Sequence, residues 1–271
     1  MADLRDRLEH RLAAFPLDGA FWLSKSRLDD LARCQGWYAA DLAGERGPFV
    51  YGFKVAVGAV VHRAVQADVA SERSLDARTL VDHAVSKQLG DRQLAEHWSG
   101  LAEVERHEIL AEATRQFAMF REMFAPFERG AQPLSELKLK LQLLGGRITL
   151  FGRPDLVLGR PPSIVVDFKT GDPHPEHVED GRFYALLLTL MFGRPAALTA
   201  TAYLDSLELQ PEEIEPHVLE RAADRVVEAV RAASLLLGGR APETLTPGPY
   251  CRWCPRSETC PANLDREDVL A

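Results

Sequence analysis

The sequence lacks any run of apolar residues approaching the roughly 18 that a membrane span needs. Its first residues, MADLRDRLEHRLAAF, carry charges of both signs and lack the apolar centre of a signal peptide. The chain also contains no internal repeat and no low-complexity segment. With 46% hydrophobic and 27% charged residues over 271 positions, it has enough apolar material to bury a sizeable core. We therefore expect a globular cytoplasmic protein without a membrane partner.

Basic residues are not in excess, and the net charge is −8. A protein that coats nucleic acid neutralises phosphates with clustered lysines and arginines, so this balance argues against a coating function. It does not exclude an enzyme that acts on nucleic acid, because a metal-dependent active site is itself acidic and the cations can be confined to one groove.

Cysteine is scarce, with four residues in the chain. Cys34 stands alone, whereas Cys251, Cys254 and Cys260 follow one another with the spacing C-x₂-C-x₅-C. In a chain without a secretion signal, this clustering indicates metal ligation before disulfides. Four thiolates suit one tetrahedral Zn²⁺ or an iron–sulfur cluster, and the spacing alone allows both. Four unliganded thiols are the remaining alternative.

The patterning divides the chain into three parts of one integrated domain. Residues 1–132 form a helical front, residues 133–240 form an α/β core, and residues 241–271 form a cysteine-bearing tail that packs back on Cys34. Different periodicities distinguish the front from the core.

Three helices are expected in the front. Ser24 or Ser26 caps a helix that runs toward Cys34. Apolar residues at helical spacing predict further helices over 53–70 and over about 101–124.

The core begins with a strict alternation, E-L-K-L-K-L-Q-L over 136–143, which predicts a strand with one buried face. Gly145-Gly146 predicts a hairpin turn, because both residues tolerate positive φ. Pro161-Pro162 predicts a second turn. Further strands are expected over 147–151, 155–158, 164–169 and 197–204, and helices over about 177–191 and 212–237.

An aspartate and a lysine stand in an otherwise apolar strand. Strand alternation places Asp167 and Lys169 on one face and Phe168 on the other. A turn centred at 161–162 pairs Asp155 with residue 167 or 168, so that two carboxylates and one ammonium converge. Carboxylates suit Mg²⁺ or Mn²⁺, which activates a water for phosphodiester hydrolysis, and the lysine orients that water or stabilises developing charge. The alternative is a simple ion pair at the end of a strand, but charges in an apolar strand are costly unless paired or metal-bound.

The segments G-R-P-D, ending at Asp155, and V-D-F-K-T-G resemble the PD-(D/E)XK nuclease superfamily. Within it, the chain resembles the RecB-like branch that includes CRISPR-associated RecB-type exonucleases, over about residues 24–260. The resemblance implies an α/β fold with a restriction-endonuclease-like core, a central mixed sheet flanked by helices. It also implies that His62, which ends a G-x-x-x-H pattern, ligates metal together with Asp155 and Asp167, and that the backbone carbonyl of Phe168 completes the site.

The family's Q-x-x-x-Y motif matches this chain in part. Tyr184 occupies the tyrosine position, and the resemblance implies that it contacts DNA near the active site. Asp180 replaces the glutamine, and is either a solvated helix residue or makes a different hydrogen bond. Arg182 and Lys140 are candidate phosphate contacts, although exposed basic residues usually serve solubility.

The cysteine pattern extends the resemblance. An S-x-S-x-L helix start precedes Cys34, and the C-terminal pattern is C-x₂-C-P-x₄-C-P. The resemblance implies that Cys34, Cys251, Cys254 and Cys260 hold a 4Fe-4S cluster, with Zn²⁺ as the alternative. One such centre would fasten residue 34 to the distant C-terminal segment and so restrict the unfolded chain.

The leading interpretation is a Mg²⁺- or Mn²⁺-dependent deoxyribonuclease. It would act as an exonuclease on duplex DNA ends or single strands in repair, recombination or spacer processing, with helicase or integration and repair proteins as candidate partners. A catalytically silent DNA-binding or structural subunit is the first alternative, although Asp155, Asp167 and Lys169 are all present. A zinc-stabilised domain unrelated to nucleases is the second, and it leaves the acidic strand pair unexplained.

Overall fold

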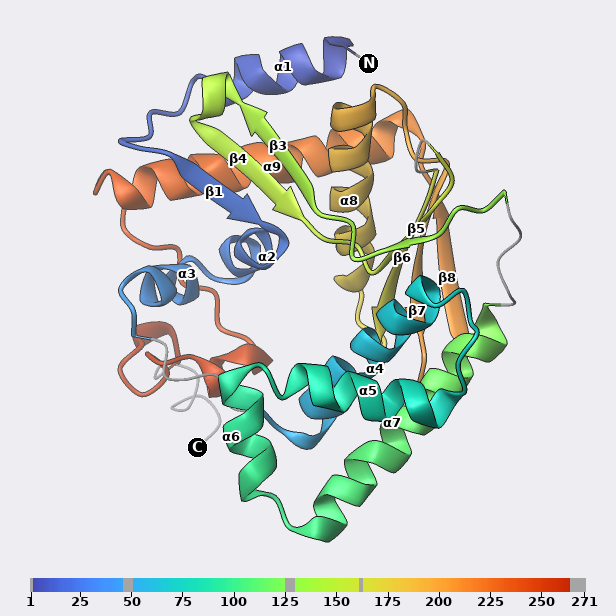
Figure 1. Cartoon of the computed structure of the whole chain (residues 1–271). Helices are drawn as coiled ribbons and strands as arrows, with labels where there is room; N and C mark the ends of the chain where they lie inside the picture. Colours follow the sequence, from blue (N-terminus) through green and yellow to red (C-terminus); the bar gives the residue numbers. More distant parts are fainter. Residues whose placement is uncertain (1, 46–50, 125–129, 161–162, 264–271) are drawn as a thin grey trace. The chain divides into compact units, whose positions relative to one another are not determined.

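The computed structural model of the chain describes residues 2–45, 51–124, 130–160 and 163–263 (Figure 1). It separates into two compact units. Unit 1 comprises Met1–Phe49, Lys140–Gly152 and Leu219–Ala271, and unit 2 comprises Val50–Leu139 and Arg153–Val218. Each unit has its own sheet, so each is described by itself.

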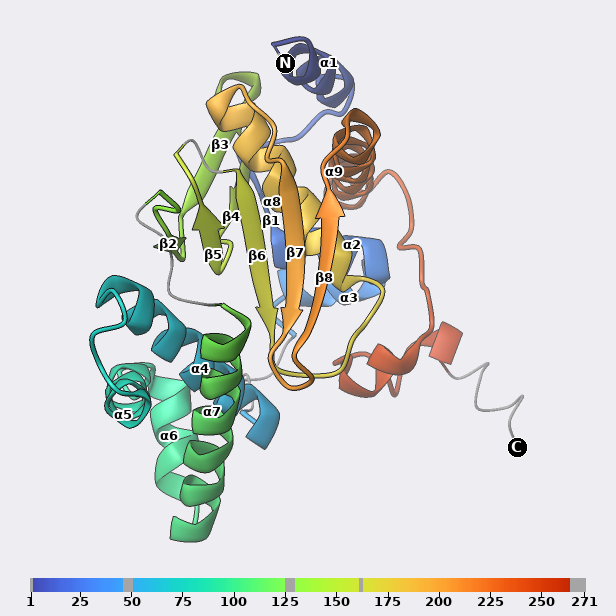
Figure 2. The same cartoon turned by 90° about the vertical axis from the view of Figure 1, so that its right-hand side faces the viewer.

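Unit 2 contains a five-stranded mixed sheet with the order β2-β5-β6-β7-β8. The strands are β2 (Leu134–Ser135), β5 (Leu156–Leu158), β6 (Ile164–Lys169), β7 (Leu198–Tyr203) and β8 (Glu208–Glu213). β6 runs parallel to β7, whereas β5 is antiparallel to β6 and β8 is antiparallel to β7 (Figure 2). The apolar residues of β6 are buried, as expected for a strand in the middle of a sheet.

Four helices of unit 2 share one hydrophobic core with this sheet. They are α4 (Phe53–Ala70), α5 (Ala77–Gln88), α6 (Arg92–Gly100) and α7 (Glu103–Met123). Asp76 and Asp91 cap α5 and α6, because their side chains accept hydrogen bonds from backbone N–H groups of the first turn. Phe168 of β6 lies in this core, where its ring contacts Phe120 edge-on at a centroid distance of 5.3 Å.

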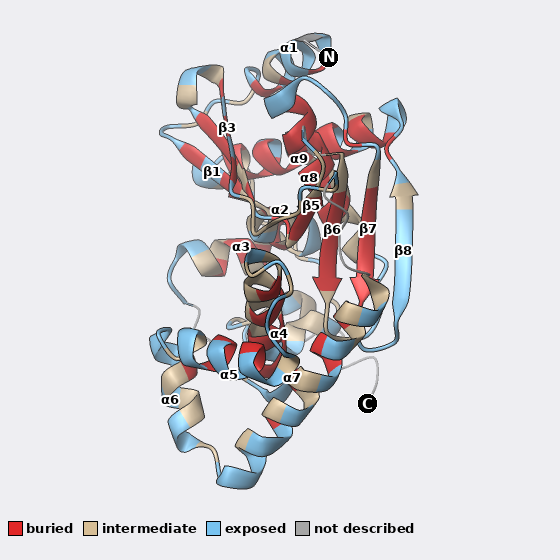
Figure 3. Cartoon of the chain, turned by 45° about the vertical axis from the view of Figure 1, so that its right-hand side comes forward, coloured by how far each residue is buried: buried red, intermediate tan, exposed pale blue. Residues whose placement is uncertain are grey.

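A fifth helix, α8 (His177–Phe192), packs against β6 and β7. A Cβ added to Gly181 would lie 3.0 Å from the Cβ of Thr199 on β7, so this glycine allows the helix to approach the sheet closely. The helix ends at Gly193, whose φ of 69° is a left-handed C-terminal cap. Figure 3 shows β6 and β7 buried and the neighbouring β8 exposed.

Unit 1 contains a three-stranded sheet with the order β1-β4-β3 and parallel pairing between β1 and β4. The strands are β1 (Phe21–Ser24), β3 (Leu139–Leu143) and β4 (Ile148–Gly152). The helices are α1 (Ala2–Leu12), α2 (Lys25–Arg33), α3 (Gln35–Leu42) and α9 (Pro216–Leu237), with short 3₁₀ turns η1 (Leu144–Gly146) and η2 (Pro249–Trp253). Ser24 caps α2 by accepting a hydrogen bond from the N–H of Arg27.

The mixed α/β architecture with sheets flanked by helices is confirmed. Gly145 and Gly146 have φ values of 65° and 92°, as the predicted turn requires. The predicted turn at Pro161-Pro162 lies outside the described residues. Among the described residues, no helix is both long and apolar enough to cross a membrane.

Two predicted boundaries are wrong. The strand expected over 136–143 begins only at Leu139, because Glu136 adopts a left-handed φ of 55° and leaves the extended conformation. The helix expected from residue 212 begins at Pro216, because Glu208–Glu213 instead pair with β7 as β8. That strand is exposed and carries no apolar signal.

Candidate active site

Asp155 lies immediately before β5 and is held by two neighbours in unit 2. Leu156 of β5 is paired with Val166 of β6, which brings Asp155 to the level of Asp167. Its Oδ2 accepts a hydrogen bond of 2.6 Å from the backbone N–H of Phe168, and its Oδ1 lies 2.9 Å from Nδ1 of His62. The antiparallel pairing thus fixes this carboxylate at the end of β5, beside the middle strand β6.

His62 reaches Asp155 from the middle of α4. One turn earlier, a Cβ added to Gly58 would lie only 2.8 Å from Oγ1 of Thr170, which directly follows β6. Glycine is therefore required for α4 to lie this close to the end of the strand. This contact explains why a glycine precedes the histidine by four residues.

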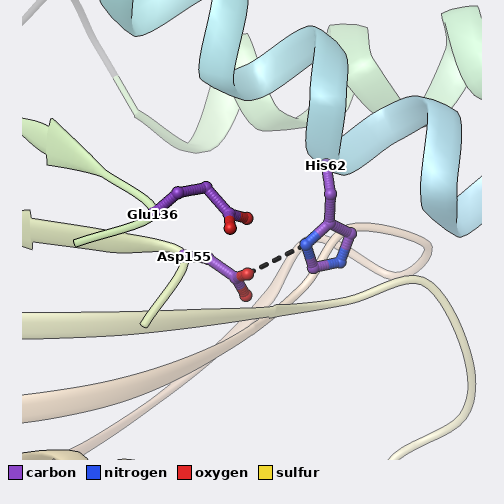
Figure 4. Close-up of side chains that lie close together, drawn as sticks. All are labelled: His62, Glu136 and Asp155. Carbon is purple, nitrogen blue, oxygen red and sulfur yellow. Dashed lines mark hydrogen bonds and ion pairs between the residues drawn. The ribbon is translucent and has the colours of Figure 1, made fainter. Parts of the chain in front are cut away.

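Glu136 joins the site although its role was not predicted from the sequence. Donor atoms of His62, Glu136 and Asp155 all lie within 4.8 Å of one another, and the three side chains point toward one another in Figure 4. The backbone N–H of Glu136 donates to the carbonyl of Asp155 at 3.0 Å, and its carboxylate also pairs with Arg153. The left-handed backbone of this non-glycine residue is a strained conformation of the kind that is often kept at functional sites.

The charges in this group perturb one another. Burial alone would lower the pKa of His62, but the carboxylates of Asp155, Asp167 and Glu136 together outweigh this effect and raise the pKa to about 9. Burial would raise the pKa of Asp155, yet His62 and the N–H of Phe168 hold it below its usual value. Burial and the neighbouring Asp155 raise the pKa of Glu136. At neutral pH the imidazole of His62 is therefore protonated, and its positive charge offsets the negative charge of the neighbouring carboxylates.

The three donor groups fit a divalent metal ion. Donors around one octahedral Mg²⁺ lie about 3–4 Å apart, so separations within 4.8 Å require only small side-chain movements. The two carboxylates are ligands that suit Mg²⁺ or Mn²⁺, and the imidazole nitrogen supplies a third donor beside them. Of the predicted ligands, His62 and Asp155 belong to this group.

Asp167 and Lys169 form a neighbouring ion pair. The Nζ of Lys169 lies 2.6 Å from Oδ2 of Asp167, as expected for two residues on the same face of β6. Asp167 is buried and is not part of the three-residue group, although it contributes to the raised pKa of His62. Burial would lower the pKa of Lys169, but Asp167 and Asp180 raise it above its ordinary value. Ligation by Asp167 and by the Phe168 carbonyl remains a prediction.

The first half of α8 carries the remaining candidates. Asp180 is only 3% exposed, so it is not a solvated helix residue, and its Oδ2 accepts a hydrogen bond of 2.7 Å from Lys169. Tyr184, one turn later, is 4% exposed, so its predicted contact with DNA would require the ring to become accessible. Arg182 forms ion pairs with Glu179 and Glu212, which makes it a poor candidate for a free phosphate contact.

The four cysteines lie in unit 1 and line one cavity of ≈ 140 Å³. None of the four forms a disulfide, and all four are of intermediate exposure. The Sγ of Cys34 accepts from the N–H of Thr246 at 3.5 Å, and that of Cys251 accepts from the N–H of Gly248 at 3.3 Å. Burial and the other three cysteines raise the pKa of Cys254. The thiols thus face a common space.

The spacing of these thiols bears on the group they could hold. Within the described residues, which include all four cysteines, no three cysteine sulfurs lie within 4.8 Å of one another. Four thiolates on one tetrahedral Zn²⁺ are about 3.8 Å apart. N–H groups directed at sulfur suit either a tetrahedral Zn²⁺ or an iron–sulfur cluster.

Lys140 also lies in unit 1, where its Nζ is 4.6 Å from the centre of the Trp22 ring. This cation–π contact gives the lysine a structural partner, and its predicted role as a phosphate contact stays untested.

The candidate acidic site therefore lies beside a strand lysine on a mixed sheet. The sequence matches the PD-(D/E)XK nuclease superfamily over residues 22–261, and the chain belongs to this superfamily. The interpretation as a zinc-stabilised domain unrelated to nucleases is therefore wrong.

A solved structure supports the fold. The crystal structure of a protein from Eubacterium rectale, provisionally described as an exonuclease, matches with a TM-score of 0.55 and 14% identity over 90% of this chain and 87% of that chain. The crystal structure of SSO0001 matches with a TM-score of 0.40 and 14% identity over 96% of this chain and 94% of that chain, too distant to support an inference. The comparison with curated proteins yields no match.

Proposed function

We propose that this chain is a Mg²⁺- or Mn²⁺-dependent deoxyribonuclease that acts as an exonuclease on DNA ends or single strands. The observation that carries the proposal is the convergence of His62, Glu136 and Asp155 within 4.8 Å. Membership of the nuclease superfamily supports the reaction class. The provisional description of the Eubacterium rectale protein is compatible with action at DNA ends.

In this proposal, His62, Glu136 and Asp155 hold the metal ion, with Asp167 and the Phe168 carbonyl as further ligands. A bound divalent ion supplies a water of lowered pKa and neutralises charge on the scissile phosphate. The N–H of Phe168 and the imidazole of His62 orient the two oxygens of Asp155 before metal binds. This arrangement reduces the reorganisation that ligation requires.

Lys169 is the second functional group of the proposed mechanism. It is mostly buried at the end of β6, and burial strengthens the electrostatic effect of its ammonium on a phosphate. We assign to it the orientation of the attacking water or the stabilisation of charge on the phosphate oxygens. Tyr184 would help to position the strand, once its buried ring becomes accessible.

For unit 1 we propose a 4Fe-4S cluster held by Cys34, Cys251, Cys254 and Cys260. The common cavity supports one group shared by all four thiols, and the resemblance of the cysteine pattern favours the cluster over Zn²⁺. Protein purified without oxygen should be brown and contain iron and inorganic sulfide in equal amounts. A colourless protein with one zinc per chain would contradict the cluster.

The cellular context is part of the same proposal. DNA repair, recombination or spacer processing in the cytoplasm, alone or with a helicase or integration proteins, is compatible with such an enzyme. A catalytically silent DNA-binding subunit is the competing function. The presence of Asp155, Asp167 and Lys169 in one site speaks against it.

A substrate panel tests the activity. Linear single-stranded and duplex DNA labelled at either end, and circular single-stranded DNA, are incubated with Mg²⁺ or Mn²⁺. The wild type should degrade linear DNA and spare the circle. Asp167→Ala and Lys169→Ala should each lose on the order of 10²-fold or more in rate. Glu228→Gln, which alters an exposed carboxylate on α9, is the matched control.

Two results would overturn the proposal. Absence of cleavage by the wild type with either metal would leave the silent subunit as the better interpretation. Equal cleavage by the wild type and both active-site variants would show that the activity comes from a contaminant.

A further inference from the structure

Lys169 lies between two buried carboxylates. Its Nζ is 2.6 Å from Oδ2 of Asp167 and 2.7 Å from Oδ2 of Asp180. The side chains of the two aspartates retain 7% and 5% of their accessible surface, and that of the lysine retains 17%. One ammonium is thus shared by two carboxylates in an environment that contains little water.

The two carboxylates come from different elements and are positioned independently. Asp167 lies two residues before Lys169 on β6, so strand geometry alone brings them together. Asp180 lies in the first turn of α8. It reaches the lysine because the next residue, Gly181, allows the helix to approach Thr199 on β7.

The proposed reaction makes different demands on these two aspartates. Asp167 is a proposed metal ligand, and a divalent ion bound to its carboxylate would weaken the attraction between that carboxylate and Lys169. A buried ammonium that loses its counter-charge is unfavourable and tends to turn toward water. A second carboxylate on another element removes this problem.

We propose that Asp180 is a positioning residue that holds Lys169 at the active site when Asp167 turns toward the metal ion. This inference rests on the proposed nuclease function. It also gives a physical reason for an aspartate where the Q-x-x-x-Y resemblance expects glutamine, since a carboxylate supplies a counter-charge that an amide lacks.

Steady-state kinetics on the linear DNA substrate, with Mn²⁺, test this role. Asp180→Asn keeps the size and a hydrogen-bond acceptor but removes the charge, and should lower kcat by about tenfold while KM for DNA changes less than twofold. Asp180→Glu should recover part of the loss. Glu212→Gln, on β8, removes one of the two carboxylate partners of Arg182, which lies on the same helix as Asp180, and should leave kcat within twofold.

A double-mutant cycle separates positioning from general structure. If Asp180 acts through Lys169, then Lys169→Ala/Asp180→Asn should be no slower than Lys169→Ala in single-turnover assays. Mn²⁺ affinity, measured by calorimetry, should be unchanged by Asp180→Asn. An activity of Asp180→Asn within twofold of the wild type, or a loss equal to that of Glu212→Gln, or weakened Mn²⁺ binding, would overturn the inference.

The experiments distinguish a failure of the positioning role of Asp180 from a failure of the proposed nuclease function. An inactive wild type defeats both. An active wild type with an impaired Lys169→Ala variant and an unimpaired Asp180→Asn variant defeats the positioning role alone.

Discussion

The acidic site of unit 2 and the cysteine site of unit 1 both combine residues far apart in the sequence, but the protein organises them to different degrees. His62, Glu136 and Asp155 are already within ligand distance, and hydrogen bonds to His62 and Phe168 fix the central carboxylate. The four thiols share a cavity, with two N–H groups directed at sulfur, but no three of the sulfur atoms lie within 4.8 Å of one another.

This difference indicates which site depends on its bound group for structure. The acidic site sits on a sheet and a long helix with their own hydrophobic core, so we expect unit 2 to stay folded without metal. Cys251, Cys254 and Cys260 lie in a segment, residues 241–263, in which no residue is buried. A cluster there would contribute directly to folding.

The largest expected effect is a loss of nuclease activity and Mn²⁺ binding that leaves the cysteine site unchanged. Asp155→Asn should reduce nuclease activity by about 10³-fold and abolish Mn²⁺ binding, because it removes the carboxylate that contacts both His62 and Phe168. Glu136→Gln should weaken Mn²⁺ binding by about 10-fold or more. Calorimetry measures the binding, and iron content should stay unchanged in both variants. A variant that loses iron as well would contradict the independence of the sites.

Substitution of a cysteine in unit 1 should leave metal binding at the acidic site of unit 2 unchanged. Cys251→Ser should lower iron content and reduce the thermal midpoint by on the order of 10 °C, with rapid proteolysis of the segment around residues 245–260. Mn²⁺ affinity should stay within a few-fold of the wild type. Ser257→Ala, in the same segment, is the control and should retain iron. Loss of Mn²⁺ binding in the cysteine variant would show that the two sites are coupled.

The close approach of α4 to β6 offers a smaller perturbation. Gly58→Ala introduces a Cβ 2.8 Å from Oγ1 of Thr170, which should displace His62 and weaken Mn²⁺ binding by about tenfold. Gly58→Ala/Thr170→Ala should recover most of the affinity, because the obstructing hydroxyl is gone. Gly100→Ala, where a Cβ meets no atom within 4 Å, should bind like the wild type.

The smallest effect concerns the pH dependence of the metal-free protein. The pKa of His62 is raised from 6.5 to about 9, so its stabilising contribution is complete below about pH 6.5 and is lost as pH rises through about 9. Because 30% of the side chain is exposed, water screens part of this interaction, and we expect on the order of 1–2 kcal/mol. Urea unfolding in EDTA should show a larger loss of stability between pH 7 and pH 9.5 for the wild type than for His62→Gln. Parallel curves would contradict the assignment.

Much of the acidic site could be predicted because its signals are local. Strand alternation places Asp167 and Lys169 on one face, and the antiparallel partner brings Asp155 alongside. The role of Glu136 was not predicted, because the sequence pattern around it suggests a different local structure. The alternation from 136 to 143 predicts a continuous strand, whereas the chain turns at Glu136 and sends its carboxylate into the site.

Other features depend on tertiary structure and leave no local signal. β8 has the sequence ELQPEE, which lacks an apolar face and becomes a strand only by pairing with β7. The same pairing delays the start of α9 to Pro216, where proline suits the first turn of a helix. The partner of Asp180 also depends on how closely α8 approaches the sheet, which no periodicity specifies.

The exposed strand β8 has a consequence for the solubility of the chain. Within the described residues it forms one edge of the five-stranded sheet, and an edge with free backbone groups is a template for intermolecular pairing. Pro211 removes one backbone donor, and Glu208, Glu212 and Glu213 make the approach of an identical acidic strand unfavourable. A strand with no apolar face thereby protects the apolar strands β6 and β7 against aggregation.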